Sequence, residues 1–155
     1  MLDILVIYHS QEYGNTEALA QMVAEGIMEG GHAEATMINT NEAQRVDMDR
    51  LAACDGFALG SPDYYSYVAG TIKQLFDDIY VARTQEGVDF SGIPSVLFMS
   101  HGGGGRAIEP FQHLARQLNV VAEPFTCQRH PPTDCPEAIE LGRQLRRAVE
   151  IRQGS

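Results

Sequence analysis

Residues 2–27 read LDILVIYHSQEYGNTEALAQMVAEGI, and they join an apolar run to an amphipathic run through a short polar loop. The first part, residues 3–8, is rich in Ile, Leu and Val and predicts a buried strand. In the second part, apolar side chains recur at the spacing of one helix face, at Leu19, Met22, Val23, Gly26 and Ile27. Gly30 and Gly31 follow as a stop signal, so the stretch predicts a strand, a loop and a helix in that order.

The same alternation continues along the rest of the chain. Further apolar runs rich in Val, Ile, Leu, Phe and Ala are expected to be strands, at residues 33–39, 55–60, 93–100 and 119–127. Helix patterns separate or follow them, at residues 68–79, 108–118 and 138–149, with a shorter and weaker candidate at 47–53. Strands too apolar to face water on one side imply a parallel sheet with helices on both faces.

These strand units predict an α/β fold, a doubly wound five-stranded parallel sheet. The length of 155 residues and the hydrophobic content of 44% suit one domain, over residues 1–155. Two strand orders fit the pattern, and both place ligands outside the carboxyl ends of the strands, where the order reverses. We therefore expect the functional site in the loops after the first, third and fourth strands.

The formal charge of the chain is −10, from 21 acidic and 11 basic side chains. A nucleic-acid partner is therefore not expected. The excess of acid suits a protein that meets basic partners through electrostatic steering, and equally one that only needs to stay soluble. Only five apolar residues follow Asp3, with no basic residue before them, so we expect neither a signal peptide nor membrane insertion. A cytoplasmic location is expected.

The three cysteines, Cys54, Cys127 and Cys135, show no cofactor-binding pattern. Their number is odd and no CxxC pair occurs, which argues against a disulfide framework, a zinc site or an iron–sulfur cluster. We expect no metal site. The sequence gives no indication of an oligomeric state.

The loop after the first strand, Ser10-Gln-Glu-Tyr-Gly-Asn-Thr16, has the composition of a phosphate-binding turn. Hydroxyls, a glycine and the N–H groups of a helix N-terminus converge on an anion, and the helix dipole favours its charge. The loop has no GK[ST] sequence, so it lacks the lysine and magnesium ligand of nucleoside-triphosphate chemistry. A phosphate is expected to be bound here but not transferred. The alternative is an ordinary helix N-cap by Asn15 or Thr16.

Three tyrosines crowd the loop after the third strand, Gly60-Ser-Pro-Asp-Tyr-Tyr-Ser-Tyr67. Their rings are expected to cover the face of a planar heterocycle, while Ser61, Ser66 and the backbone offer hydrogen bonds to its edge. The alternative for any one tyrosine is packing in the core or on the surface, and the sequence does not choose which ring stacks.

Four glycines dominate the loop after the fourth strand, Ser100-His-Gly-Gly-Gly-Gly105. They let the backbone approach a ligand closely and present N–H groups to its carbonyls. Gly102, Gly104 and Ala107 also satisfy G-x-G-x-x-A before a helix, with Glu123 near the spacing of a dinucleotide-binding Rossmann motif. That motif belongs in the first strand–helix turn, where this chain has the hydroxyl-rich loop. A Rossmann protein is therefore the less favoured alternative.

The three loops together resemble those of a known group of flavoproteins. SQEYGNTE, residues 10–17, resembles the phosphate loop of flavodoxins. GSPDYYSYVAGTIKQLFDD, residues 60–78, resembles the flavin-ring loop and following helix of NAD(P)H-dependent FMN reductases, iron–sulfur flavoproteins and tryptophan-repressor-binding-protein-like quinone reductases. SHGGGG, residues 100–105, matches the third loop of the same group, although the cluster cysteines of iron–sulfur flavoproteins are missing.

The resemblance implies the flavodoxin-like strand order 2-1-3-4-5 and one bound FMN. It implies that the first loop holds the phosphate, through Ser10, Tyr13, Gly14, Asn15 and Thr16, with Gln11 beside them. It places the isoalloxazine against residues of the other two loops, Pro62, Asp63, Tyr64, Tyr65, Ser66, Tyr67, Ser100, His101, Gly102, Gly103 and Gly104. The first loop is one residue longer than the flavodoxin pattern, which leaves the individual roles of Gln11, Glu12 and Tyr13 open.

The resemblance implies that the flavin carries the chemistry, with no catalytic side chain. Two functions are consistent with it: an electron carrier between redox partner proteins, or an enzyme that takes hydride from NAD(P)H and reduces a quinone or another small acceptor. The charge of −10 favours the carrier, and the reductase-like second loop favours the enzyme, with Arg106 as the nearest cation. His130, in CQRHPPTDC, is a candidate to stand near the flavin, as a histidine does in the quinone reductases.

Overall fold

The computed structural model of the chain describes residues 1–11, 13–43, 45–128 and 135–154. Its strands are β1 (Leu2–Tyr8), β2 (Ala33–Asn39), β3 (Gly56–Pro62), β4 (Pro94–His101), β5 (Asn119–Val120) and β6 (Phe125–Gln128). Its helices are α1 (Asn15–Met28), α2 (Met48–Ala53), α3 (Gly70–Gln85), α4 (Ile108–Leu114) and α5 (Pro136–Gln153), with a 3-10 turn η1 (Ala115–Gln117) after α4.

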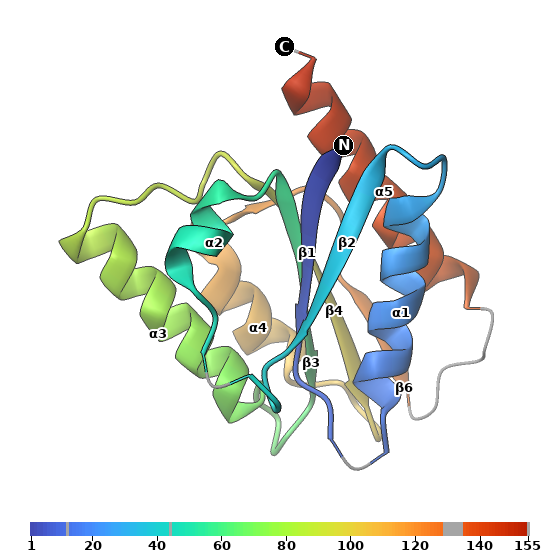
Figure 1. Ribbon diagram of the computed structural model, residues 1–155. Coiled ribbons are helices and arrows are strands. Elements are labelled where there is room, and N and C mark those ends of the chain that lie inside the picture. The colour runs from blue at the N-terminus through green and yellow to red at the C-terminus, as the bar shows by residue number, and fades with distance from the viewer. Residues whose placement is uncertain (12, 44, 129–134, 155) are drawn as a thin grey trace.

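All the strands pair in parallel, in the order β2-β1-β3-β4-β5, and β6 also pairs with β4. The predicted doubly wound sheet and its order 2-1-3-4-5 are confirmed. Helices α1 and α5 cover one face of the sheet, and α2, α3 and α4 cover the other (Figure 1). Successive side chains of a strand point to opposite faces, so Leu5 and Ile7 lie in the core under α3, while Ile4 and Val6 lie in the core under α1.

The prediction of one strand over residues 119–127 is wrong, because the structure has two short strands there. Val120 pairs with Ser95, and Phe125 pairs with Phe98. From Val120 to Phe125 the chain advances five residues, whereas from Ser95 to Phe98 β4 advances only three. Two residues between β5 and β6 therefore cannot pair with β4. Pro124 lies in this gap and has no N–H to donate. The apolar pattern gave the location of the strand but not this interruption.

Two strands run further toward the candidate site than predicted. β3 ends at Pro62 and β4 ends at His101, and Pro62 pairs in register with Ser100. The first residues of the second and third loops are therefore held by the sheet itself. The helix expected at 108–118 ends as α4 at Leu114 and continues as η1.

A close crossing of α1 and α5 fixes the position of α1 on the sheet. A Cβ atom added to Gly26 would lie 1.9 Å from the carbonyl oxygen of Ile139, and one added to Gly142 would lie 2.0 Å from that of Val23. Only glycine fits at both positions, because the obstacle is backbone that cannot rotate away. Since α1 begins directly after the first loop, this crossing also sets where that loop lies.

Candidate functional site

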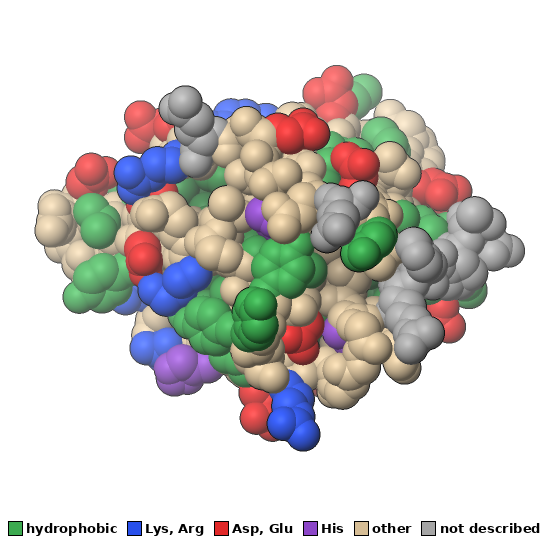
Figure 2. Space-filling view, turned by 90° about the horizontal axis from the view of Figure 1, so that it is seen from below, with side chains coloured by type: hydrophobic (Ala, Val, Ile, Leu, Met, Phe, Trp, Pro, Cys, Tyr) green, Lys and Arg blue, Asp and Glu red, His purple; other side chains and the backbone are tan. Residues whose placement is uncertain are grey.

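The three loops singled out in the sequence meet at one edge of the sheet, because they follow the carboxyl ends of β1, β3 and β4 (Figure 1). Figure 2 looks onto this edge, where hydrophobic side chains gather near the centre and both acidic and basic side chains lie around them. Large exposed apolar rings in these loops are Tyr13, Tyr64, Tyr65 and Tyr67. The edge thus offers aromatic surface surrounded by charged side chains of both signs.

The first loop enters α1 through Gly14, which has a left-handed conformation with φ of 70°. Gly14 occupies the N-cap position and no side chain caps the helix there, so the alternative of a cap by Asn15 or Thr16 is wrong. The hydroxyl of Ser10 instead accepts the N–H of Glu17 at 3.2 Å. Asn15 and Thr16 lie in the first turn of α1, where backbone N–H groups have no partner within the helix.

A side-chain contact joins the first loop to the third. The hydroxyls of Thr16 and Ser100 are both buried and lie 2.7 Å apart. These two residues are 84 positions apart in sequence: Thr16 lies in the first turn of α1, and Ser100 lies near the end of β4. The sequence names both as ligand-binding residues, and the structure brings them into direct contact.

The second loop forms a tight hairpin turn that projects tyrosines. Tyr64 and Tyr67 exchange both backbone hydrogen bonds, at 2.9 and 3.1 Å, and Tyr65 and Ser66 between them have φ of 58° and 63°. Two positive φ values in this arrangement are typical of a type I′ turn, which asparagine and glycine favour. Tyr65 stands at its tip, fully exposed, so the tyrosines are not core residues.

The carboxylate of Asp63 holds this hairpin against the third loop. One of its oxygens accepts the N–H of Ser66 at 2.9 Å, and the other accepts the N–H of Ala107 at 3.2 Å. Its own N–H donates to the carbonyl of Ser100 at 2.9 Å. Ser61, which was expected to face a ligand, is instead fully buried and bonded to the carbonyl of Pro62 and the N–H of Ala69. That prediction is wrong, because β3 carries Ser61 into the core.

The strain in this turn leads to a stability prediction. Replacing Ser66 by glycine is expected to raise the free energy of unfolding by about 0.5–1 kcal/mol, because relief of the left-handed strain exceeds the added entropy of the unfolded chain. Urea unfolding of the flavin-free protein measures the change. Ser66→Ala is the matched control, since alanine keeps the strain and is expected to give no gain. Equal stability of Ser66→Gly and Ser66→Ala would contradict the explanation.

The third loop presents open backbone. A Cβ on Gly102 or Gly103 would meet nothing within 4 Å, and Gly104 and Gly105 have φ of 77° and 59°. The rival Rossmann interpretation requires the N-terminus of α4 to receive a phosphate. There the N–H of Ala107 already donates to a carboxylate, and α4 has only seven residues. The arrangement therefore disfavours a dinucleotide phosphate at this position.

The sequence analysis missed His9, a buried residue between β1 and the first loop. Its Nδ1 lies 2.6 Å from the hydroxyl of Thr71, and its ring packs edge-to-face on Tyr64 with centroids 5.8 Å apart. Burial lowers the pKa of His9, and Gln11 opposes the shift in part. A polar ring directly after an apolar strand was the available signal. His130 and Glu12 lie outside the described residues.

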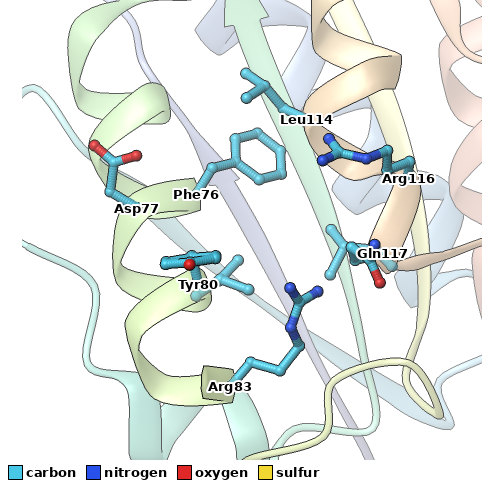
Figure 3. Close-up of a pocket in the computed structure, with 9 residues that line it drawn as sticks. Phe76, Asp77, Tyr80, Arg83, Leu114, Arg116 and Gln117 are labelled. Atoms are coloured by element: carbon cyan, nitrogen blue, oxygen red, sulfur yellow. The ribbon is translucent and has the colours of Figure 1, made fainter. Parts of the chain in front are cut away.

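A separate hollow of about 180 Å³ lies between α3 and the end of α4 (Figure 3). Phe76 and Leu114 contribute apolar surface to it, and the guanidinium groups of Arg83 and Arg116 lie at its side (Figure 3). Arg83 lies 6.0 Å from the centroid of the Tyr80 ring. Its lining residues do not come from the three loops, so the hollow is not part of the candidate site.

Three further features concern the described part of the chain: metal sites, membrane-spanning helices and reactive thiols. It contains no group of His, Cys, Asp and Glu side chains placed to hold a metal ion. No helix in the described ranges is long and apolar enough to cross a membrane. Burial raises the pKa of the Cys54 thiol to about 12, and burial raises that of Cys135 as well. These thiols are therefore poor nucleophiles at neutral pH.

Comparison with known proteins finds flavodoxins and flavo-diiron proteins among the similar ones. A flavodoxin of Aquifex aeolicus is 33% identical over 118 residues, covering 75% of this chain and 60% of that protein. The flavo-diiron protein FprA2 of Clostridium acetobutylicum is 29% identical over 150 residues, covering 92% of this chain and 36% of that protein. A solved flavodoxin from the domain Archaea superposes with a TM-score of 0.80 at 24% identity, covering 96% of this chain and 99% of the other. No model of a protein family matches the chain.

The chain belongs to the flavodoxin-like family. The predicted family is thereby confirmed, and FMN is the cofactor that this family implies. The chain spans 60% of the flavodoxin and 36% of the flavo-diiron protein.

Two features of the three loops suit a bound FMN: buried polar atoms that no described residue satisfies, and open backbone together with exposed rings. Among the described residues, Oδ1 of Asn15 and Nδ1 of His101 are buried without a hydrogen-bond partner, one in the first loop and one at the third. A buried polar atom without a partner is costly, so a ligand that satisfies it gains affinity. Oδ1 of Asn15 can only accept a hydrogen bond, so a hydroxyl or N–H group of FMN can satisfy it and the phosphate cannot. The open glycines and the exposed tyrosines of the other two loops leave room for a flat ring. The residues present are therefore suited to the family's cofactor.

Proposed function

We propose that this flavodoxin-like protein binds one FMN across its three loops and transfers electrons through it. The observation that carries the proposal is the buried contact of Thr16 with Ser100, which joins a phosphate-type helix start to the glycine loop. The proposed FMN-binding residues are 10, 11, 13–16, 62–67 and 100–104, within one domain over residues 1–155. A cytoplasmic location belongs to the same proposal.

The first loop is proposed to hold the phosphate without a cationic side chain. Residues 10–16 contain no Lys or Arg, so hydrogen bonds and the α1 dipole must balance the phosphate charge. The hydroxyl of Thr16 and the N–H groups of the first turn are the donors closest to the helix start. When bound, FMN supplies the reversible electron transfer that side chains cannot.

The second and third loops are proposed to hold the ring. Tyr64 and Tyr67 flank the hairpin and are exposed on the loop edge, while Gly102 and Gly103 leave their backbone accessible. Asp63 places a carboxylate between these loops, where its charge opposes the addition of electrons to a nearby ring. We therefore propose that the site lowers the reduction potential of FMN, and that the net negative charge of the chain guides docking on basic redox partners.

Flavin titration tests the proposal. The apoprotein is expected to bind one FMN and to prefer it to riboflavin, because only FMN carries the phosphate that the α1 start receives. Fluorescence titration with FMN, riboflavin and FAD measures this preference. Riboflavin bound as tightly as FMN, or no flavin bound at all, would refute the proposed site.

The second candidate function is an NAD(P)H-dependent reductase of quinones or other small acceptors. The reductase-like sequence of residues 60–78 favours it. Oxidation of NADH and NADPH by the FMN-loaded protein, with and without a quinone, separates the two functions. A carrier is expected to leave both nicotinamides unreacted, and rapid turnover with either would favour the enzyme.

A further inference from the structure

A chain of hydrogen bonds runs from the end of β1 to His9. The hydroxyl of Thr40 donates to the carbonyl of Tyr8 at 3.2 Å. The same hydroxyl lies 2.7 Å from that of Thr71, which lies 2.6 Å from Nδ1 of His9. The three bonds tie together the ends of β1 and β2 and the first turn of α3.

Only one assignment of donors and acceptors allows all three hydrogen bonds to form at once. A carbonyl can only accept, so the single hydrogen of Thr40 is given to Tyr8. Thr40 must then accept from Thr71, whose hydrogen is thereby used, and Thr71 must accept from His9. Nδ1 of His9 therefore carries a hydrogen.

The surroundings favour the neutral ring. Burial lowers the pKa of His9 by more than the neighbouring Gln11 side chain raises it, and the positive end of the α3 dipole lies beside the ring through Thr71. A neutral imidazole with hydrogen on Nδ1 has a bare lone pair on Nε2. His9 is 5% exposed, and among the described residues its Nε2 has no hydrogen-bond partner. The flavin-free protein thus holds, at Nε2 of His9, a buried acceptor that no described residue satisfies.

We propose that Nε2 of His9 accepts a hydrogen bond from a ribityl hydroxyl of the flavin, which makes His9 a further binding residue. The inference rests on the proposed function. His9 precedes Ser10 of the phosphate loop and packs on Tyr64 of the ring loop, so it stands between the groups that hold the two ends of FMN. The ribityl chain joins those two ends, and its hydroxyls are hydrogen-bond donors. A bare acceptor at this position can accept a hydrogen bond from a ribityl hydroxyl, but not from the phosphate, which is itself an acceptor.

Nitrogen-15 NMR of the wild-type protein tests the hydrogen placement without any variant. In the flavin-free protein at neutral pH, Nδ1 of His9 is expected to show the resonance of a protonated ring nitrogen, and Nε2 that of a bare one. Addition of riboflavin is expected to move the Nε2 resonance toward the protonated side, as for an accepted hydrogen bond. A hydrogen on Nε2 in the free protein would overturn the inference.

A ligand series with two variants tests the contact itself. The amide N–H of His9→Asn can replace Nδ1 but leaves no atom at Nε2, whereas the amide oxygen of His9→Gln can replace Nε2. His9→Asn is expected to weaken FMN and riboflavin about 3- to 10-fold and to spare lumiflavin, which lacks the ribityl hydroxyls. His9→Gln is expected to lose less. His113→Asn, at an exposed histidine of α4, is the matched control for loss of a histidine.

The outcomes separate this inference from the proposed function. Equal losses for lumiflavin and riboflavin in His9→Asn would show that His9 acts through packing, and would overturn the inference alone. Absence of FMN binding by the wild-type protein would overturn the proposed function together with it. Thermal unfolding of each flavin-free variant checks that the fold is retained, and the NMR result on the wild type decides the tautomer if a variant fails to fold.

Discussion

Replacing Thr16 by valine is expected to weaken FMN binding about 10- to 100-fold while riboflavin affinity changes little, because the lost bond is one to a charged group. Valine keeps the branched shape of threonine and removes only the hydroxyl. Thr16 lies in the first turn of α1 and is buried, so a phosphate at this helix start would meet its hydroxyl with little competition from water. Parallel titrations with FMN and riboflavin measure the effect.

The buried bond of Thr16 to Ser100 provides the comparison that interprets this result. Ser100→Ala breaks the same contact between the loops but leaves the Thr16 hydroxyl in place. If Thr16 contacts the phosphate, Ser100→Ala should not reproduce the selective loss of FMN. Equal losses of FMN and riboflavin in both variants would show that the contact between the loops matters, and that the phosphate does not meet Thr16.

The second large effect concerns stability. Gly142→Ala is expected to lower the free energy of unfolding by about 3 kcal/mol, because the new methyl group would lie 2.0 Å from the carbonyl oxygen of Val23. The helices α1 and α5 would have to separate, which opens the core between them. The effect runs against local preference, since alanine favours an isolated helix by about 1 kcal/mol over glycine. Urea unfolding of the flavin-free protein measures the change.

Gly70→Ala is the matched control. Gly70 is likewise a helical glycine, at the first position of α3 rather than in a helix interior, and a Cβ there would meet nothing within 4 Å. Its replacement is expected to be neutral or slightly stabilising. The crossing explanation fails if the two variants have the same stability. Because α1 carries the first loop, Gly142→Ala is also expected to weaken FMN binding.

Much of the fold could be predicted because the signals are local. The apolar run of residues 3–8 and the spacing from Leu19 to Ile27 each describe a single element, and β1 and α1 formed where expected. The three loops could be grouped because carboxyl ends of parallel strands share one edge. The composition of each loop then indicated a phosphate, a flat ring and a close backbone approach.

The errors arose where contacts between distant residues decide the structure. The bond of Ser10 to Glu17 and the cap at Gly14 depend on how the loop folds back, which composition does not specify. Ser61 is carried into the core because β3 pairs with β4 for two residues beyond the predicted end. The break between β5 and β6 depends on their register against β4.

The sequence by itself determined the order of the elements, the edge of the sheet that carries the site and the type of ligand to expect, because side-chain period and loop composition are properties of neighbouring residues. The tertiary structure alone decided that Thr16 meets Ser100, that Gly26 and Gly142 let α1 and α5 touch, and that His9 is held by Thr71. Each of these contacts joins residues from different elements. Their geometry is set by how whole helices and strands pack, so no local pattern records it.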